Sequence, residues 1–598
     1  MKLNHRYSCI ILIIIPLILF INSLLLNYAM GPFWQYADPC YLYLFNAIHF
    51  LKGIAPTHID HPGTPVQLLI LFIIFIINLG SSVTVIVEKV LRNPEYYLHA
   101  VNYILITGIA LSSYLLAKYV YNKTQDLLAA LLTQLPGLTF LITKSFTSTL
   151  PVPPVVANVN PEPLLIIILN LFNLSWFSLF FAKDSKERLL ATLMLGFICG
   201  LGLATKLTFF PILICALIIL SWPLKLIFMG MSLISFCLWT LPIMHQYPIL
   251  WAWAKGIVTH TGMVGDGSQG FIDFPKYLYT LVHIFLPEYG LFNIFAIASF
   301  IVSSIKIIEK KQNPVYKFLW VINIGILFQF AMVAKHYSSH YLLPGLGLFS
   351  CALPLFYLGF LSENKILKQF TLIFIIIFTI ITSSQTFIYY PKLSTLTQEI
   401  SNAREGIYNK YPGAAIIAPA DSNPFFNQKF ALLFADRFYS RLLYNKSYTH
   451  QESDELSVLY PDSYYLNFDG TSASHDNLGY GICDFKERVF ADDLLEKYPD
   501  VIFINYKFDF YAHNGFDLSE HPLTAILVND SKYADIYRIT ASTDKESTEL
   551  LNAAMMLSEK GQYKEAFALA LKSRELNYQP KDQADFILSI IYNHLRQP

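Results

Sequence analysis

Long apolar runs recur along the N-terminal part of this chain, and they limit its fold more than any other feature. A helix needs about 20 residues to cross a hydrocarbon core of about 30 Å. Runs near that length cover residues 9–26, 66–87, 99–116, 127–142, 163–181, 189–205, 207–222, 224–243, 288–305, 318–334, 341–361 and 370–388. Charged residues make up only 14% of the chain, against about 25% in soluble proteins. The sequence therefore predicts a polytopic α-helical membrane protein.

Acidic and basic side chains balance in this chain, with 42 Lys and Arg against 42 Asp and Glu. A protein that binds nucleic acid uses a basic surplus to neutralise the phosphate backbone. The balance therefore argues against that class of partner, and we expect no nucleic acid.

The charged connections between the apolar runs predict how the chain is oriented. Short loops rich in Lys and Arg tend to stay in the cytoplasm. The basic loops contain Lys183, Lys186 and Arg188; Lys306, Lys310, Lys311 and Lys317; and Lys365 and Lys368. When the membrane crossings are counted from these cytoplasmic loops, four segments fall on the extracytoplasmic side: residues 143–162, 245–276, 335–340 and everything after residue 389. We therefore expect an integral protein of the cell (inner) membrane with an extracytoplasmic active site and C-terminus.

Residues 66–87 conflict with this count if they cross the membrane. The first apolar run follows Lys2 and Arg6 and has no small-residue cleavage site after it, so it is expected to stay as a helix with a cytoplasmic N-terminus. From that start, a crossing by residues 66–87 would invert every later loop. We therefore expect this segment to lie along the membrane or to re-enter it, which leaves about 11 spans.

The composition changes after residue 390. Short apolar runs such as 414–418 and 501–505 are bounded by Pro412, Gly413 and Pro499, which is typical of buried strands between helices. Residues 391–545 are therefore expected to form an extracytoplasmic α/β domain. The helical spacing in residues 546–598 resembles a tetratricopeptide (TPR-like) unit. The alternative is a helical hairpin that caps the domain, because stable arrays need at least three repeats.

Polar motifs occur in the loops that are expected outside the cytoplasm. The first loop carries Asp38 within an aromatic stretch and ends in Asp60-His61-Pro62-Gly63-Thr64-Pro65. Later motifs are Asn160-Pro161-Glu162-Pro163, the glycine-rich residues 200–206 that end in Lys206, and Tyr341-Leu342-Leu343-Pro344 after Lys335 and His340. Their order and common side resemble the GT-C glycosyltransferases over roughly residues 1–390, and within them the bacterial protein-mannosyltransferase and lipid A aminoarabinose transferase group. His340 stands where arginine is common in that family, and histidine, unlike arginine, is not a permanent cation at neutral pH.

The resemblance implies a GT-C fold that moves a sugar from a polyprenyl-phosphate donor to a glycan, lipid or protein acceptor, with inversion. Asp38 would take the proton of the acceptor hydroxyl, and Glu162 corresponds to the second acidic position of the family. The leaving phosphate would be stabilised by cations. The candidates for that role are Lys206, Lys335 and His340, and those for the substrate loops are Asp60, His61, His260 and Asp266.

Each candidate residue also has a structural interpretation. Asp38 could cap a short helix, and Asp60 could pair with His61 to fix the loop. Glu162 would be stabilised by the dipole at a helix start. Lys206 could extend to the membrane interface. The remaining candidates, Lys335 and the histidines, could be interface anchors.

The loop of residues 247–275 combines Trp251 and Trp253 with several glycines and with His260 and Asp266. Long glycine-rich loops beside a site often close over substrate. The alternative is an aromatic belt at the interface joined to a flexible link. No D-x-D sequence or histidine cluster with metal-ligand spacing is evident in the external loops, so no cofactor is certain and a divalent metal is left open.

Two other function classes fit a polytopic chain. A transporter or flippase would place charges on broken helices at mid-bilayer and show repeated halves, whereas the acidic residues here lie at span ends. A non-catalytic scaffold would present the C-terminal domain to a partner. Replacement of Asp38 by asparagine separates the enzyme from both alternatives, because it removes the base and keeps the shape.

Overall fold

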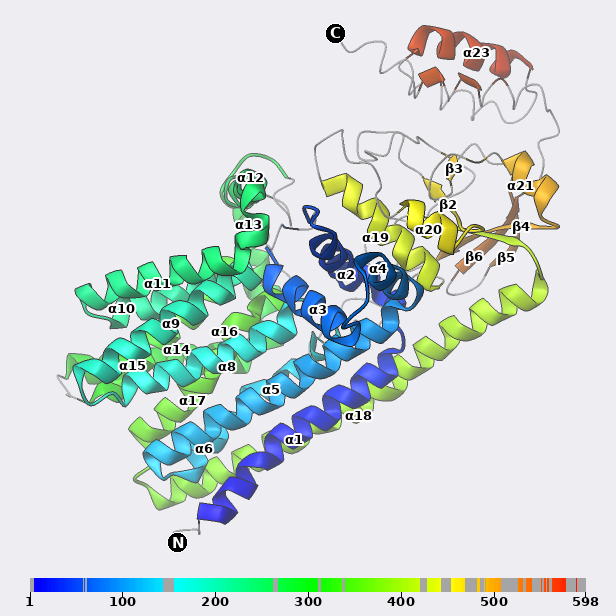
Figure 1. Ribbon diagram of the computed structural model, residues 1–598. Helices are drawn as coiled ribbons and strands as arrows, with labels where there is room; N and C mark the ends of the chain where they lie inside the picture. The colour runs from blue at the N-terminus through cyan, green and yellow to red at the C-terminus, as the bar shows by residue number, and fades with distance from the viewer. Residues whose placement is uncertain are drawn as a thin grey trace.

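The protein consists of a tilted bundle of helices with a small sheet domain at one end (Figure 1). The computed structural model describes residues 5–56, 59, 62–142, 155–261, 267–309, 313–335, 339–419, 427–442, 453–467, 481–483, 489, 491–506, 525–530, 534–539, 550, 553–554, 557–558, 562–576 and 588.

Long apolar helices build the bundle and make this an integral membrane protein. Within the described ranges, nine helical stretches are long and apolar enough to cross a membrane. They are built on α1 (His5–Met30), α5 (Pro94–Thr124), α8 (Pro161–Phe180), α9 (Ser185–Thr205), α11 (Trp222–Thr240) with α12 (Tyr247–Thr259), α14 (Leu286–Ile308), α15 (Pro314–Val333), α16 (Leu343–Gly347) with α17 (Phe349–Phe356), and α18 (Lys365–Lys410). The described residues thus contain nine candidate spans, whereas the sequence predicted about 11.

Two of the expected spans are too short in the structure to be counted among the nine. Residues 127–142 form the short helices α6 (Leu127–Leu132) and α7 (Leu135–Thr139), and Pro136 stands at the start of α7. Residues 207–219 form a 3-10 turn and then α10 (Phe210–Ile219), with Pro211 in its first turn. Counted across these prolines, the apolar stretches Leu127–Thr139 and Leu207–Ile219 extend over about 20 Å as helix, which is too short to cross a core of about 30 Å.

Residues 66–87 are not one helix. The first part is α3 (Thr64–Ile77), whose 14 residues span about 21 Å. A turn follows in which Gly80 has φ +83°, and α4 (Val83–Arg92) comes next. Neither helix is long enough to cross a core of about 30 Å as a straight helix.

One end of the bundle carries most of the irregular and short elements, and we call it the site end. It holds the 3-10 turn η1 (Phe33–Tyr36), α2 (Ala37–Lys52), α3 and α4, all of which lie near the sheet domain (Figure 1). The described basic side chains of the connections assigned to the cytoplasm lie at the other end. Lys186, for example, stands in the first turn of α9, whereas Lys206 follows its last residue.

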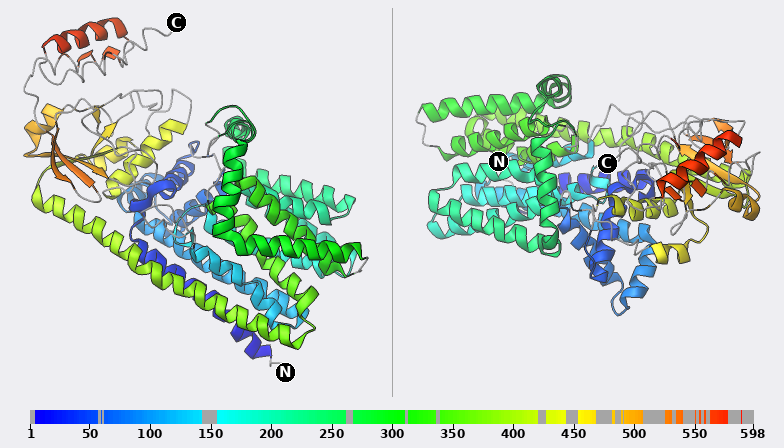
Figure 2. Two further views of the ribbon diagram at one scale, coloured as in Figure 1. Left: turned by 180° about the vertical axis from the view of Figure 1, so that it is seen from behind. Right: turned by 90° about the horizontal axis from the view of Figure 1, so that it is seen from above.

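Helix α18 joins the membrane bundle to the sheet domain without a break. Its 46 residues extend over about 69 Å, more than twice the hydrocarbon core. It runs beside α1 along one side of the bundle (Figure 2). The Thr397 hydroxyl of α18 donates to the carbonyl oxygens of Ala29 and Met30 at 2.9 and 3.1 Å. The predicted domain boundary at residues 390 and 391 lies inside this helix.

The region beyond α18 contains a six-stranded mixed sheet in its described part. The strands are β1 (Ala415–Pro419), β2 (Tyr464–Asn467), β3 (Gly481–Cys483), β4 (Val501–Tyr506), β5 (Ala525–Asp530) and β6 (Ala534–Ile539), in the order β3-β2-β1-β4-β6-β5. The central strand β1 is parallel to β2 and β4, and Ile417 pairs with both Tyr464 and Phe503. The accompanying helices are α19 (Gln428–Leu442), α20 (Ser453–Leu459) and α21 (Ala491–Lys497).

The sheet domain packs on the site end of the bundle. The hydroxyl of Tyr460 donates to the carbonyl of Leu91 at 2.9 Å, and the Gln428 amide donates to the carbonyl of Arg92 at 3.1 Å. The last carbonyl groups of a helix have no N–H partners within that helix. These two bonds therefore supply donors to carbonyl groups at the carboxyl end of α4. Lys52 of α2 also forms an ion pair of 3.0 Å with Glu455.

The C-terminal helical region is described only in part. Helix α23 (Tyr563–Leu576) buries Ala566 and Ala570 against Ala554 and Leu588. Most of the remaining residues of 546–598 lie outside the described ranges, so the TPR-like unit stays a prediction.

Candidate functional site

Three of the predicted site residues meet at the site end of the bundle. Glu162 lies in the first turn of α8, Lys206 follows the last residue of α9, and His340 lies in the 3-10 turn Ser339–Leu342. Glu162 and Lys206 form an ion pair in which the two side chains are only 3% and 4% exposed. Nε2 of His340 is 3.9 Å from Oε1 of Glu162, and its side chain is 37% exposed. The pair of Glu162 and Lys206 is therefore buried, whereas the imidazole of His340 beside it is partly exposed.

Local sequence explains why α8 begins at Glu162. Asn160 has extended backbone angles, and Pro161 follows at the first helical position. Proline is tolerated there because its missing N–H would have no partner in the helix. Glu162 consequently stands in the first turn, where the helix dipole favours an anion.

Lys206 is directed out of its helix by its own backbone. Its φ of −161° and ψ of 131° are extended, so α9 ends at Thr205. Gly202 allows the chain to turn back closely, because a Cβ at this position would lie 2.6 Å from the ring of Phe209. The extended backbone of Lys206 then pairs with Pro62 in an isolated antiparallel bridge. The glycine-rich motif is thus a packing device that positions the lysine.

An aromatic ring completes the surroundings of Lys206. The ammonium nitrogen lies 4.7 Å from the ring centroid of Tyr341, a geometry in which the ring face attracts a cation. The amide of Gln329 holds the backbone by donating to the carbonyl of Tyr341 at 2.7 Å. The sequence motif singled out Tyr341, but it did not predict this contact.

The irregular segment before α8 is fixed by side chains from three helices. The amide of Asn27 in α1 donates to the carbonyl of Ala157 at 3.1 Å, and that of Asn102 in α5 donates to the carbonyl of Asn158 at 3.1 Å. Cys40 of α2 donates to the side-chain oxygen of Asn158 at 2.7 Å. Non-helical backbone within a membrane bundle needs such partners. The same contacts bring the start of α2 close to the start of α8.

Asp38 is the second residue of α2, but its side chain is outside the described structure. Its helix is tied through Cys40 to Asn158, which lies shortly before Glu162. The role of Asp38 as a base therefore stays a prediction, and the backbone places it on a helix that contacts the site.

Glu95 was missed by the sequence analysis, and it holds the beginning of α2 in place. Its carboxylate accepts from the backbone N–H groups of Phe33 and Trp34 at 2.7 and 2.9 Å. It also accepts from the hydroxyl of Tyr41 at 2.6 Å, and burial together with this carboxylate raises the pKa of Tyr41. Glu95 follows Pro94 at a helix start. No local signal linked it to residues far earlier in the chain.

The loop that precedes α3 lies beside Lys206. Asp60 and His61 are outside the described residues, but Pro62 and Gly63 are described. Gly63 has φ +67°, and a Cβ there would lie 2.8 Å from the ring of Tyr43. Only glycine combines this left-handed backbone with that close approach at little cost, which explains the Pro-Gly sequence.

Lys335 has a different environment from Lys206. Its ammonium donates to the carbonyls of Ile257 and Val258 at 2.6 and 2.7 Å, at the carboxyl end of α12. It also lies 4.8 Å from the ring centroid of Phe271. Partial burial lowers the pKa of its amine. Its described contacts therefore stabilise α12, and a role toward phosphate stays a prediction.

The remaining candidates lie in the loop after α12. His260 pairs with Gln269 in an antiparallel bridge, and Nδ1 of its ring is 2.9 Å from the hydroxyl of Thr259. Asp266 is outside the described residues. In the ranges that the structure describes, no group of three or more His, Cys, Asp or Glu side chains is arranged to hold a metal ion.

The comparisons with known proteins assign no family to this chain. No protein-family model matches it, and no curated protein matches it. The crystal structure of ArnT from Cupriavidus metallidurans bound to undecaprenyl phosphate is similar, with a TM-score of 0.48 and 10% sequence identity, over 90% of this chain and 99% of that chain. A similarity of this degree does not assign a function.

Proposed function

We propose that this protein is a membrane-embedded glycosyltransferase of the GT-C type that transfers a sugar from a polyprenyl-phosphate donor to an extracytoplasmic acceptor, with inversion. The observation that carries the proposal is the buried pair of Glu162 and Lys206, with His340 at its exposed edge. The resemblance of the sequence motifs to that superfamily agrees with this grouping.

The depth of Lys206 suits a phosphate whose lipid remains in the bilayer. A polyprenyl chain keeps its head group at the membrane edge, and Lys206 lies at the end of a membrane-spanning helix. A cation acts most strongly where water is excluded and charge develops, and this side chain is 4% exposed. Lys206 would therefore stabilise the leaving phosphate, assisted by His340 when its imidazole is protonated.

Glu162 balances the charge of Lys206 and holds its ammonium group in one position before the donor arrives. A buried pair costs desolvation free energy for both ions, and apolar residues of similar volume often replace such pairs without loss of stability. The presence of a buried pair is thus weak evidence that these two residues serve only to stabilise the fold. A buried charge pair with a partly exposed imidazole at its edge is instead an arrangement that functional sites use.

The base of the proposed reaction is Asp38. A carboxylate can remove the proton of an acceptor hydroxyl in the transition state, and displacement from one side of the sugar inverts the anomeric centre. The contact of Cys40 with Asn158 supports this assignment, because it brings α2 to the segment that leads into Glu162.

The proposed side of the membrane follows from charge. Lys186 and Arg188 lie in the first turns of α9, at the opposite end from Lys206. Because basic short connections tend to stay in the cytoplasm, the site end is assigned to the extracytoplasmic face. The sheet domain packs on the same end and is assigned to the same side.

The decisive experiment compares the surface glycolipids and glycoproteins of a deletion strain with those of the complemented strain by mass spectrometry. We expect a glycan product that wild-type protein restores and Asp38→Asn reduces by about 10² to 10⁴-fold, the usual range for a general base. Glu162→Gln should also fail to restore it. Glu309→Gln, which changes an exposed pair with Lys306 at the opposite end, is the matched control and should restore it fully.

Normal product with both Asp38→Asn and Glu162→Gln, at normal expression, would contradict the enzyme. A transporter, flippase or scaffold would then explain the chain better, because none of them needs a base at Asp38.

A further inference from the structure

The side chain of Asn158, a residue outside the sequence motifs, links α2 to the start of α8. Asn158 lies in the segment that leads into α8 and is 7% exposed. Its Oδ1 accepts from the thiol of Cys40 in α2 at 2.7 Å and from the backbone N–H of Val159 at 2.8 Å. An amide oxygen has two lone pairs and can accept both donors. One atom therefore joins α2 to the chain that runs into Glu162.

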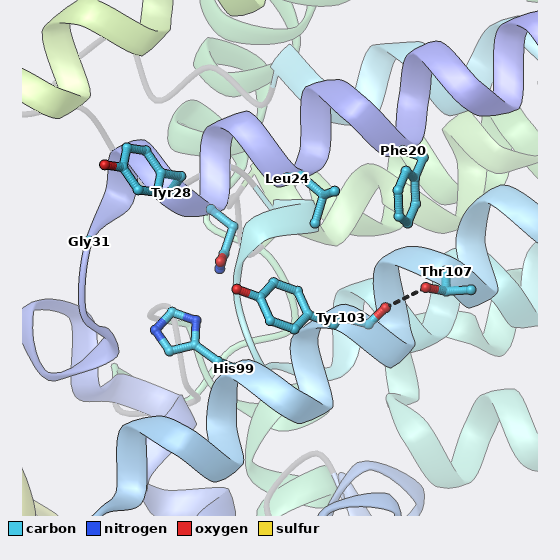
Figure 3. Close-up of a pocket in the computed structure, with 8 residues that line it drawn as sticks. Phe20, Leu24, Tyr28, Gly31, His99, Tyr103 and Thr107 are labelled. Atoms are coloured by element: carbon cyan, nitrogen blue, oxygen red, sulfur yellow. Dashed lines mark hydrogen bonds between the residues drawn. The ribbon is translucent and has the colours of Figure 1, made fainter.

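The segment before α8 is itself fixed to the bundle by two helices. Figure 3 shows α1, which carries Leu24, beside α5, which carries Tyr103. From these helices the buried amides of Asn27 and Asn102 donate to the backbone carbonyls of residues 156–158, at 3.1 to 3.4 Å. The acceptor oxygen for α2 is thus presented from a backbone that is held in place.

The connection from Asn158 to Glu162 is short and stiff. Val159, Asn160 and Pro161 lie between them. The residue before a proline is restricted to extended backbone, and Asn160 has φ −140° and ψ −179°. The ring of Pro161 fixes its own φ. A displacement of Asn158 is therefore passed on to Glu162 and is not absorbed between them.

The partner of this oxygen stands in the first turn of α2. Cys40 follows Asp38 by two residues on that helix, and its side chain is 0% exposed. Glu95 holds the chain just before α2 through two backbone N–H groups. The beginning of α2 is consequently held at two points, by Glu95 before the helix and by Asn158 within its first turn.

We propose that Asn158 is a positioning residue of the reaction and sets the distance between the base at Asp38 and the pair of Glu162 and Lys206. This inference rests on the proposed function. In an inverting transfer the base and the cation act on opposite faces of one sugar carbon. Misplacement by about 1 Å can lower a rate about 10²-fold. Asn158 acts through the two groups that it holds and not on the substrate.

The test measures how fast the glycan product appears when wild-type or variant protein is expressed in the deletion strain, per amount of protein in the membrane. Asn158→Leu keeps the branched shape and removes the acceptor oxygen, so we expect a rate about 10²-fold lower. Asn170→Leu is the matched control. Asn170 is also buried and joins α8 to α5 by donating to the Ser112 hydroxyl at 3.0 Å, further along α8. It should lose similar stability and keep the wild-type rate.

A second pair of variants changes the donor. Cys40→Ala removes the S–H group, and we expect a rate about tenfold lower, as for one lost hydrogen bond. Cys40→Ser supplies an O–H group, which is a stronger donor than S–H, and should keep the rate near that of wild type. A packing role alone predicts the opposite order, because a buried hydroxyl is less favourable than a methyl group in an apolar site. This pair also decides if Asn158→Leu does not fold.

A double variant separates positioning from folding. In Asp38→Asn the base is already absent, so adding Asn158→Leu should lower the residual rate no further. A defect of the fold would instead lower the rate by the same factor with and without Asp38→Asn.

The thiol of Cys40 reports on the link without any product. Purified full-length protein in detergent is treated with a maleimide, and the adduct on the Cys40 peptide is followed by mass spectrometry. Asn158→Leu should raise the labelling rate about tenfold, because one buried hydrogen bond no longer opposes local opening. Asn170→Leu should leave the labelling rate unchanged.

A wild-type rate in Asn158→Leu, while Asp38→Asn lowers the rate, would overturn the positioning role and leave the enzyme intact. Unchanged labelling of Cys40 in Asn158→Leu would overturn the link itself. Equal losses of rate in Asn158→Leu and Asn170→Leu would assign Asn158 to stability alone. If neither Asp38→Asn nor Glu162→Gln changes the product, the proposed function has failed and this inference fails with it.

Discussion

Lys206 and Lys335 lie at the same end of the bundle, each just beyond the end of a membrane-spanning helix, yet their surroundings differ. Lys206 is 4% exposed and is paired with a carboxylate and an aromatic ring. Lys335 is half-buried and donates to two backbone carbonyls of α12. One lysine is balanced by an opposite charge and the other by the dipole at a helix end. The comparison shows that neighbours from distant parts of the chain decide what a lysine at a helix end does.

The largest effect is expected for Lys206→Met. It leaves the Glu162 carboxylate buried without its partner, and breaking a buried pair in this way costs about 3 to 5 kcal/mol. The free energy of unfolding in detergent, followed by denaturant titration, measures the loss. Lys335→Met is the matched control. Equal losses in the two variants would remove the distinction between the two lysines.

The next effect is expected for Glu162→Gln, which keeps the shape and removes the negative charge. Lys206 retains a neutral acceptor, so we expect a smaller loss of about 1 to 3 kcal/mol. The double variant with Lys206→Met should be more stable than the sum of the two losses predicts, because both charges are then absent. Strict additivity in unfolding measurements would show that the two side chains do not interact.

A smaller effect is expected for Tyr341→Leu. The substitution keeps an apolar side chain near Lys206 and removes the ring face, which is worth about 2 kcal/mol for a desolvated cation. Tyr341→Phe keeps the ring and serves as the control. If both variants lose the same stability, the hydroxyl group and not the ring supports Lys206.

The smallest effect on global stability is expected for Lys335→Met, about 0.3 to 1 kcal/mol, because a lysine at a helix carboxyl end contributes about that much. The local effect should be larger. Limited proteolysis should cut faster near the end of α12, where Ile257 and Val258 lose their donor. Loss of the glycan product with an intact fold and unchanged proteolysis would instead assign Lys335 to the donor phosphate.

Several local features followed from the sequence alone. The apolar runs and the basic connections predicted an integral membrane protein, because both depend on residues that are close in the chain. The start of α8 at Pro161 and Glu162 is a local effect of proline and the helix dipole. The end of α9 at Thr205 also depends on nearby residues, because Gly202 leaves room for the ring of Phe209. The spans expected at residues 127–142 and 207–222 are shorter helices in the structure, because apolar length was weighed above the helix starts at Pro136 and Pro211.

Only the tertiary structure decided which of these residues are neighbours. Glu95 accepts from N–H groups 61 and 62 positions earlier, and Asn27 donates to a carbonyl 130 positions later. Glu162 and Lys206, 44 positions apart, form a buried pair, whereas Lys335 donates to the backbone carbonyls of Ile257 and Val258. Composition and spacing set where each side chain stands on its own helix. Partners are chosen by how helices pack, since a hydrogen bond or an ion pair requires contact in space that distance along the chain does not specify.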